Sequence, residues 1–520
     1  MSATKRHRGS IGIIDIFAGP GGLGEGFSSF EATPGNRPFR IGVSAEMEKS
    51  AHSTLRLRAF LRLLREQEGA LPKSYLEYLR AHAVGAAPPP QIHFAKGLFQ
   101  PLWEEAENEA LNLTLGQPGH NRKLYERITE VRKRVDQLVL IGGPPCQAYS
   151  LVGRARQRNV EGFATRGDHR HFLYREYLQI LAQFRPDVFI MENVKGILSS
   201  TVGGRNMFAS ILRDLSDPSR ALAKRGGVHD QYVLLPIHAD PDDRRDPDVA
   251  ANDPGKFVIR SEAHGVPQAR HRVILMGVRA EYVHRAVSAP GLLCAENRKT
   301  VEEALRGLPR LRSGLSRQVD DADAWAAAFK RQKRRVIGAI GSNARSLREL
   351  IESFDGDYRL PRASISFVAG HQRRGDGESL PLLNHETRGH MEADLGRYLY
   401  CAAYALQHAR SPSSAEFPRR LAPDHANWES GDFADRFRVQ LKNKPSSTVT
   451  SHLSKDGHAF IHWDPSQCRS LTVREAARLQ TFPDDYLFLG NRTQQFVQVG
   501  NAVPPVLARQ IAEVVWSILK

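Results

Sequence analysis

The sequence has few cysteines and no long hydrophobic run. Its 520 residues contain four cysteines, Cys146, Cys294, Cys401 and Cys468, and no two of them form a C-x-x-C pair. This gives no support to a zinc ribbon or a dithiol redox motif, and so few cysteines in a long chain fit a reducing compartment best. No apolar run approaches the roughly 20 residues that span a bilayer. The basic start, MSATKRHRGS, lacks the apolar core of a signal peptide. We therefore expect an intracellular protein without a membrane segment.

Acidic residues are fewer than basic residues. The chain has 73 Lys and Arg residues against 57 Asp and Glu residues, which gives a formal net charge of +16. Such an excess favours a polyanionic partner, most simply nucleic acid, although a merely basic soluble protein is the alternative. The length allows two or three domains, or one large elaborated domain.

The stretch IGGPPCQAYS, residues 141–150, combines a strand end, a rigid turn and one cysteine. The apolar run 138–141 followed by two glycines predicts a buried strand that leads into a loop. In open α/β sheets, ligands bind beyond the carboxyl ends of such strands. The two prolines restrict the backbone before Cys146, so the thiol is positioned at little entropic cost. On this stretch alone, Cys146 is either a nucleophile at the mouth of a cleft or a buried apolar cysteine.

A glycine-rich turn follows another predicted strand near the start of the chain. The apolar run 11–17, with Asp15 inside it, precedes the sequence Ala-Gly-Pro-Gly-Gly-Leu-Gly. Strand, glycine-rich turn and helix is the layout of a nucleotide-cradling loop. No Lys-Ser/Thr follows, so the turn is not a phosphate loop. The next predicted strand, 39–44, ends near Glu46, which is either a ribose-binding carboxylate or an ordinary surface charge.

Two further segments place polar side chains at strand ends. Residues 186–191 predict a strand leading into Glu192, whose carboxyl, partly buried beside Cys146, would have a raised pKa and could hold a proton. A carboxylate satisfied by backbone amides is the alternative. The runs 257–261 and 272–278 predict two strands around a Gly-Pro turn. Arg270 and Arg272 would then point to the same side, where two guanidinium groups suit an oxygen-rich ligand.

The rest of the chain predicts an insertion, a loop and a second domain. Residues 52–136 have helical periodicity, with basic side chains that form a solvated face or contact nucleic acid. The stretch 153–170 is rich in Arg and Gly and is either a phosphate-binding loop or a plain surface loop. Residues 280–464 mix helices with polar and basic loops. Capping boxes begin helices at Thr300 and Thr472, and regular structure after residue 471 indicates a return to the first domain.

The ordered set of motifs resembles the cytosine-5 DNA methyltransferase family, which transfers a methyl group from S-adenosylmethionine to carbon 5 of cytosine. The matching motifs are IDIFAGPGG (14–22), SAEME (44–48), GGPPCQAYS (142–150), MENVKG (191–196), HGVPQARHR (264–272), LTVREAARLQTFP (471–483) and VGNAVPP (499–505). They occur in the family's order and leave uncovered mainly 49–137 and most of 281–440. PPCQ and ENV together are far more specific than the glycine-rich loop.

The resemblance implies a role for each matched residue. Cys146 would be the nucleophile, Glu192 would bind the cytosine edge, and Arg272, with Arg270, would hold the base. The S-adenosylmethionine site would comprise Phe17, Gly19, Gly21, Gly22, Glu46, Met47, Asn501, Ala502 and Val503. The candidate DNA contacts are Gln147, Ser150, Arg154, Arg156 and Arg158. No metal is expected.

The resemblance also implies the architecture and the activity. We expect a Rossmann-like α/β methyltransferase sheet with helices on both faces, and a smaller mixed target-recognition domain. The catalytic domain would span 1–280, with a helical insertion at about 49–137, the target-recognition domain 281–470, and a return to the catalytic domain 471–520. The expected activity is DNA (cytosine-5-)-methylation of a flipped-out cytosine in a specific duplex sequence. By family analogy, the protein would be a monomer in the bacterial cytoplasm, acting in a restriction-modification system.

Two functions on the same scaffold are alternatives: an RNA methyltransferase and a non-catalytic DNA-binding relative. The long region 281–470 favours duplex recognition. One departure from the family concerns an acidic residue on a third cofactor strand between residues 48 and 142. That residue has no clear match, and 95–99 is the nearest candidate. The sequence also does not name the base that removes the carbon-5 proton.

Overall fold

The computed structural model describes residues 10–68, 72–144, 169–202, 205–222, 231–237, 253–341, 344–363, 367–368, 380–424, 428 and 436–520. The chain forms two compact units. The first comprises Met1–Glu66, Pro90–Asn297 and Ala502–Lys520, and the second comprises Gln67–Pro89 and Arg298–Asn501. Each unit therefore takes in segments that are far apart in the sequence.

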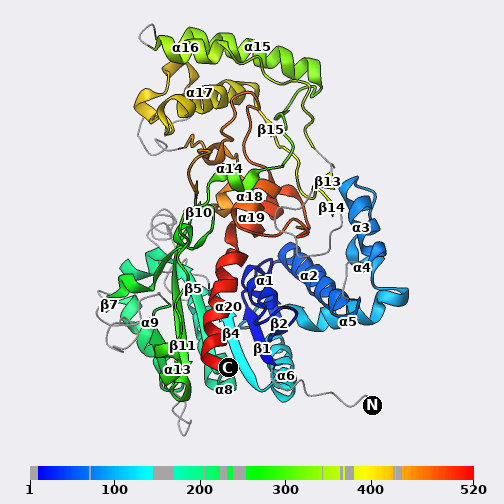
Figure 1. Ribbon diagram of the computed structural model, residues 1–520, viewed down its shortest axis with the longest axis vertical. Coiled ribbons are helices and arrows are strands. Elements are labelled where there is room, and N and C mark those ends of the chain that lie inside the picture. Colours follow the sequence, from blue (N-terminus) through cyan, green and yellow to red (C-terminus); the bar gives the residue numbers. More distant parts are fainter. Residues whose placement is uncertain are drawn as a thin grey trace. The chain divides into compact units, whose positions relative to one another are not determined.

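A central eight-stranded sheet organises the first unit (Figure 1). Its strands are β1 (Ile11–Ile16), β2 (Phe39–Glu46), β3 (Ala110–Asn112), β4 (Gln137–Gly142), β5 (Val188–Val194), β8 (Tyr232–Leu235), β9 (Val258–Arg260) and β11 (His271–Arg279). The order is β3-β2-β1-β4-β5-β11-β8, with β9 beside β11. The first five strands of this order are parallel, and β11 runs antiparallel to its neighbours. The predicted Rossmann-like α/β fold class is confirmed.

Helices cover both faces of this sheet. One face carries α6 (Pro118–Arg134), α8 (His169–Phe184) and α9 (Met207–Ser216), and the other carries α1 (Gly22–Ser29), α13 (Val283–Ser288) and α20 (Pro505–Leu519). Successive strand residues alternate between the two cores: Phe189 and Met191 pack on the first face, whereas Val188 and Ile190 pack on the second. This alternation follows from the two-residue period of a strand and explains why the central strands are apolar throughout.

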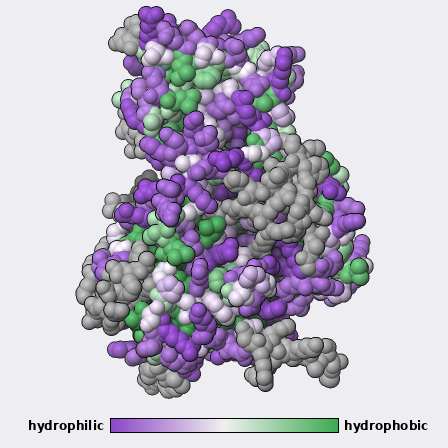
Figure 2. Space-filling model, viewed as in Figure 1, coloured by the Kyte–Doolittle hydropathy of each residue, from purple (hydrophilic) through white to green (hydrophobic). Residues whose placement is uncertain are grey.

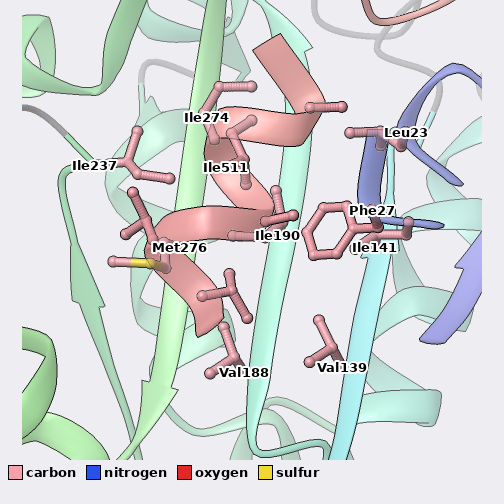
Figure 3. Packing of buried hydrophobic residues seen from close by; sticks show 14 of the residues in the cluster. Leu23, Phe27, Val139, Ile141, Val188, Ile190, Ile237, Ile274, Met276 and Ile511 are labelled. Atoms are coloured by element: carbon pink, nitrogen blue, oxygen red, sulfur yellow. The ribbon is translucent and has the colours of Figure 1, made fainter. Parts of the chain in front are cut away.

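Helix α20 fills the second core. Ile511 lies among Phe27 of α1 and the strand residues Ile141, Ile190 and Ile274 (Figure 3). The helical stretch Arg492–Leu519 is long and apolar enough to cross a membrane by length and composition, but 67% of its window is buried inside the protein. Packing of α20 against the sheet accounts for its apolar character.

The remaining helices of the first unit come largely from the segment predicted to be a helical insertion. They are α2 (Lys49–Glu68), α4 (Pro90–His93) and α5 (Gln100–Glu109). This segment is not purely helical, because β3 lies within it and pairs in parallel with Ser44–Glu46 of β2. The expectation that 95–99 holds the third cofactor strand was wrong, since Gly97–Phe99 is a short 3-10 helix.

The second unit has its own hydrophobic core around three helices. These are α15 (Ala322–Ala339), α16 (Arg345–Glu352) and α17 (Glu392–His408), with Trp325, Phe329 and Tyr398 among the buried residues. These helices fall within the region 280–464, for which the sequence predicts a mixture of helices and loops. The unit also contains α3 (Lys73–Ala83), α14 (Val301–Leu305), α18 (Val473–Leu479), α19 (Arg492–Asn501) and the short strands β12 (Gly314–Leu315), β13 (Phe367–Val368), β14 (Leu380–Pro381) and β15 (Gly389–His390). The predicted capping boxes at Thr300 and Thr472 are both formed.

Candidate active site

The carboxyl ends of β4 and β5 meet at one point of the sheet. An ideal Cβ on Gly143 would lie 3.0 Å from Oε2 of Glu192, so the strand end and this carboxylate are in direct contact. Nδ2 of Asn193 donates to the carbonyl oxygen of Pro144 over 3.2 Å, which fixes the turn that follows β4. The next residues, Pro145 to Ser150, lie outside the described residues, and so does Cys146. The structure thus describes the chain up to two residues before the predicted nucleophile.

Glu192 is bound by an arginine from the antiparallel neighbour of its strand. Nε of Arg272, in β11, lies 2.8 Å from Oε1 of Glu192, and each side chain keeps a little over a tenth of its surface exposed. Arg272 is further held because Nη1 donates to the carbonyl oxygen of His271 over 2.8 Å. The sequence-based expectation of a carboxyl that holds a proton through burial left out this cationic partner. Because neither side chain is fully buried, an incoming polar ligand can replace one partner of this ion pair.

Arg270 lies behind this ion pair and is almost fully buried. Burial, together with the nearby cation of Arg272, lowers the pKa of Arg270 to about 9, while Glu192 acts in the opposite direction. The structure therefore brings Glu192, Arg270 and Arg272 together, as the sequence predicts. These strand ends therefore offer an oxygen-rich ligand two guanidinium groups beside one carboxylate.

The predicted DNA contacts lie in the segment that follows β4. Gln147, Ser150, Arg154, Arg156 and Arg158 all lie outside the described residues. Within the described residues, no group of three or more His, Cys, Asp or Glu side chains is placed to hold a metal ion.

The glycine-rich loop between β1 and α1 has an unusual backbone. Phe17, Gly19 and Gly21 have φ values of 56°, 58° and 99°, which lie in the left-handed region. Glycine adopts this region without strain, whereas Phe17 does so at some energetic cost. A tight turn of this kind aims backbone N–H groups at one point. It also brings the amino end of α1 against Val503, which precedes α20.

Gly22, the first residue of α1, leaves no room for a side chain. An ideal Cβ there would lie 2.2 Å from the backbone oxygen of Val503. We expect Gly22→Ala to lower the free energy of unfolding by about 1–3 kcal/mol, because backbone must move to relieve the overlap. Denaturant unfolding measures this change.

Gly119→Ala is the matched control for Gly22→Ala. Gly119 lies in α6, and an added Cβ would have no atom within 4 Å. Alanine is the better helix former, so this variant should be unchanged or slightly more stable. Equal destabilisation in the two variants would contradict the steric explanation at Gly22.

Glu46 closes the loop from the next strand. Its Oε2 accepts from N of Gly19 and its Oε1 accepts from N of Glu48, both over 2.8 Å. Burial raises the pKa of this carboxyl, whereas the backbone hydrogen bonds lower it. The next residue, Met47, has an exposed side chain, with 60% of its surface accessible. A hydrogen-bond acceptor thus lies beside an exposed apolar side chain.

Sequence reasoning missed Asn112, the last residue of β3. Its Nδ2 donates to the carbonyl oxygens of Glu46 and Met47 over 2.9 and 3.2 Å, and its amide oxygen has no donor among the described residues. The signal that could have located β3 is the alternation of Leu111, Leu113 and Leu115, all buried in the first core. Asn112 occupies the strand end where the family usually has an acidic residue.

Asp15, near the end of β1, is almost fully buried. Desolvation raises the pKa of Asp15 to about 8, with Arg62 acting in the opposite direction. Its Oδ2 lies beneath the first turn of α1, 2.9 Å from the position of a Cβ on Gly24. The neighbouring Glu25 and Arg58 form a bidentate buried ion pair, with both hydrogen bonds at 2.8 Å.

The last predicted cofactor residues are Asn501, which ends α19, and the two residues after it. Asn501 is exposed, whereas Ala502 and Val503 are buried. Of these residues, Val503 contacts the glycine-rich loop through the backbone atoms described above. The structure therefore brings Phe17, Gly19, Gly21, Gly22, Glu46, Met47 and Val503 to one end of the sheet.

Comparisons with known proteins identify one family over most of the chain. A family model described as C-5 cytosine-specific DNA methylase matches residues 119–218 and 257–517. The Type II methyltransferase M.Bpa9945I of Bacillus paralicheniformis is 31% identical over 518 residues, which cover 98% of this chain and 99% of that protein. The Type II methyltransferase M.AgeI of Thalassovita gelatinovora is 28% identical, with 76% of this chain and 86% of that protein covered. The DNA (cytosine-5-)-methyltransferase M.ApeKI of Aeropyrum pernix is 27% identical, with 74% and 82% covered.

Proposed function

Because this chain belongs to the C-5 cytosine-specific DNA methylase family, we propose that it methylates carbon 5 of a flipped-out cytosine in duplex DNA through a covalent Cys146 adduct. Its enzyme class is DNA (cytosine-5-)-methyltransferase. The observation that carries the proposal is the contact of Glu192 with Arg272 and with the turn that leads to Cys146. The reaction needs a thiol, a carboxyl group and a guanidinium group around one pyrimidine. The carboxyl group of Glu192 and the guanidinium group of Arg272 are already in contact.

The proposed role of the sulfur follows from the chemistry of cytosine. Carbon 5 is a poor nucleophile until a thiolate adds to carbon 6, and only the thiolate form of Cys146 can do this. Once carbon 5 carries the methyl group, a base removes its proton and the bond from sulfur to carbon 6 breaks. These two events restore the aromatic ring and the free thiolate. The described residues do not include an obvious base for this proton, and a water molecule is our candidate.

Glu192 and Arg272 stabilise the ring while sulfur is bound. Addition to carbon 6 places negative charge on the ring. The barrier falls when Glu192 takes up a proton as the base enters and donates it to nitrogen 3, while the guanidinium of Arg272 donates to the carbonyl oxygen. Arg270 is proposed to hold the base together with Arg272, and its charge adds to the positive potential at these strand ends. The ion pair of 2.8 Å keeps both groups within reach of a single base. The base must leave the helix to reach them.

The residues at the carboxyl ends of β1, β2 and β3 fit S-adenosylmethionine. Glu46 offers carboxylate oxygens for ribose hydroxyls, exposed Met47 offers an apolar face for adenine, and the open space at Gly19 allows close approach to the backbone. Phe17, Gly21, Gly22, Ala502 and Val503 complete the proposed wall of the site, together with Asn501. When bound, this cofactor supplies the electrophilic methyl group.

Asn112 is our proposed adenine contact on the third strand. Replacing it with alanine should weaken S-adenosylmethionine binding by roughly 3- to 12-fold, the value of one neutral hydrogen bond of about 0.5–1.5 kcal/mol. Methyl transfer at saturating cofactor should be unchanged. Isothermal titration with the cofactor and initial rates at two cofactor concentrations measure these two quantities. An unaltered dissociation constant would contradict the assignment.

The second unit is proposed to recognise the target sequence. It contains most of the region 281–470, which matches the family least in its motifs. The predicted catalytic domain, 1–280 with the return 471–520, differs in its bounds from the first unit, because residues 67–89 and 471–501 belong to the second unit. We propose that the first unit holds the catalytic site and that the enzyme acts as a monomer in the bacterial cytoplasm. Its relatives carry type II names, so the proposed biological role is protection of DNA in a restriction-modification system.

The proposed function has a direct test. Purified protein should transfer labelled methyl groups from S-adenosylmethionine to duplex DNA, and bisulfite sequencing of a plasmid from expressing cells should show methylated cytosine in one sequence context. An equimolar competition between transfer RNA and duplex DNA separates the two substrate classes. Transfer to RNA in preference to DNA, or plasmid DNA without methylated cytosine, would refute the proposal.

A further inference from the structure

The middle of α15, in the second unit, carries a run of cations with the sequence KRQKRR at 330–335. Lys330, Arg331, Arg334 and Arg335 are exposed, whereas the opposite side of the helix is buried in the core of the unit. Figure 1 shows α15 at the surface of this unit, and Figure 2 shows a mostly hydrophilic surface over the same part. The cations therefore form the solvent face of an amphipathic helix.

These charges are not explained by the stability of the helix. Lys330 and Arg334, and also Arg331 and Arg335, are four residues apart, a spacing at which like charges repel. None of the four is in the last turn, where the helix dipole would favour a cation. Arg331 pairs with both carboxylate oxygens of Glu392. For Lys330 and Arg334, no acidic partner lies among the described residues.

A second segment adds to the same surface. The 3-10 helix Arg419–Leu421 packs against α15, and Nη2 of Arg335 donates to the carbonyl oxygen of Arg420 over 2.9 Å. The side chains of Arg419 and Arg420 are exposed. On α15, the exposed residues on either side of the cations are small, Ala327 and Gly338. The cations therefore project from a helix face that a flat, rigid partner could approach closely.

We propose that Lys330, Arg331, Arg334, Arg335, Arg419 and Arg420, the α15 basic surface, bind the sugar-phosphate backbone of DNA. The proposal rests on duplex DNA as the substrate and adds contacts to those at the methylated base. Arginine and lysine are the side chains that most often contact phosphate oxygens. Arginine and lysine can also bind guanine edges, so the backbone contacts are identified by their salt dependence on a duplex of arbitrary sequence. The excess of 73 basic over 57 acidic residues agrees with a polyanionic partner.

The test measures how the affinity for a duplex of arbitrary sequence, 40 base pairs long, depends on salt. Each phosphate contact contributes about −0.9 to the slope of log affinity against log salt concentration. The double variant K330Q/R334Q should make this slope less steep by about 1.8. Both side chains are exposed, so the thermal unfolding midpoint should not fall. At low salt and saturating DNA, methyl transfer should be unchanged, which separates failure of this surface from failure of the proposed function.

The matched control is K133Q/R134Q, which removes the same charge from another exposed helix segment. These residues end α6, at the amino end of β4, whereas the proposed catalytic groups follow the carboxyl ends of the strands. Their removal should leave the slope unchanged. An unaltered slope in K330Q/R334Q, or an equal change in both double variants, would overturn the proposal, because the effect would then not come from contacts at α15. Loss of binding to an acidic protein without any change in the slope would overturn it as well.

Discussion

Cys146→Ala is expected to abolish methyl transfer, with a loss on the order of 10⁴-fold or more, because no other group can make the bond to carbon 6. The variant should keep its affinity for S-adenosylmethionine, since the cofactor residues are on other strand ends. A second readout uses duplex DNA made with 5-fluorocytosine in place of cytosine. Fluorine at carbon 5 cannot leave as a proton does, so the sulfur–carbon bond persists and the complex survives denaturing electrophoresis.

The chain provides a matched control for the cysteine. Cys294 is an exposed free cysteine, and Cys294→Ala removes a thiol without touching the proposed site. This variant should retain full transfer and form the covalent complex. The complex should be absent with Cys146→Ala. If the covalent complex formed with Cys146→Ala but not with Cys294→Ala, the nucleophile would be Cys294 and the assignment to Cys146 would be refuted.

Glu192→Gln is expected to lower kcat by about 10²–10³-fold, the size of effect that follows when stabilisation of a developing charge is lost. Glutamine has the shape of the carboxyl group and can still accept from Arg272, so the KM for DNA should change little. It cannot transfer a proton to nitrogen 3, which is why the rate, and not binding, should suffer. Initial rates over a range of DNA concentrations separate these two parameters.

Glu281→Gln serves as the comparison for Glu192→Gln. Glu281 pairs with Arg279 at the other end of β11, over 3.1 Å, and is largely exposed. Its substitution removes a carboxylate from an arginine pair but should leave kcat unchanged. A fall in kcat of similar size in both variants would show that the loss arises from disturbing β11 and not from chemistry at Glu192.

The sequence was most informative where strands are buried on both faces. The parallel strands β1, β4 and β5 are continuous apolar runs, because the two cores of the first unit cover both sides of the sheet. Polar residues directly after such runs, among them Glu192, were for that reason predicted correctly to lie at the carboxyl edge. Arg272 was placed with Glu192 only through the resemblance to the family.

The sequence was least informative where tertiary contacts decide the local structure. β3 has three residues, Ala110–Asn112, too few to show a period by themselves, and it is a strand because it pairs with β2. Asn112 was missed with it. The contact between Arg272 and Glu192 was also beyond prediction from periodicity, because it joins neighbouring strands that are far apart in the chain.

Helix α20 makes the folding of the central sheet depend on a segment that is synthesised long after most of its strands. Leu507, Ile511 and Val515 fill one side of a sheet whose strands β1, β4 and β5 leave the ribosome much earlier. Until these residues emerge, that side of the nascent sheet stays uncovered, and Val503 is not held against the glycine-rich loop. A chain cut before Pro505 should therefore leave that side of the sheet uncovered and should not support methyl transfer.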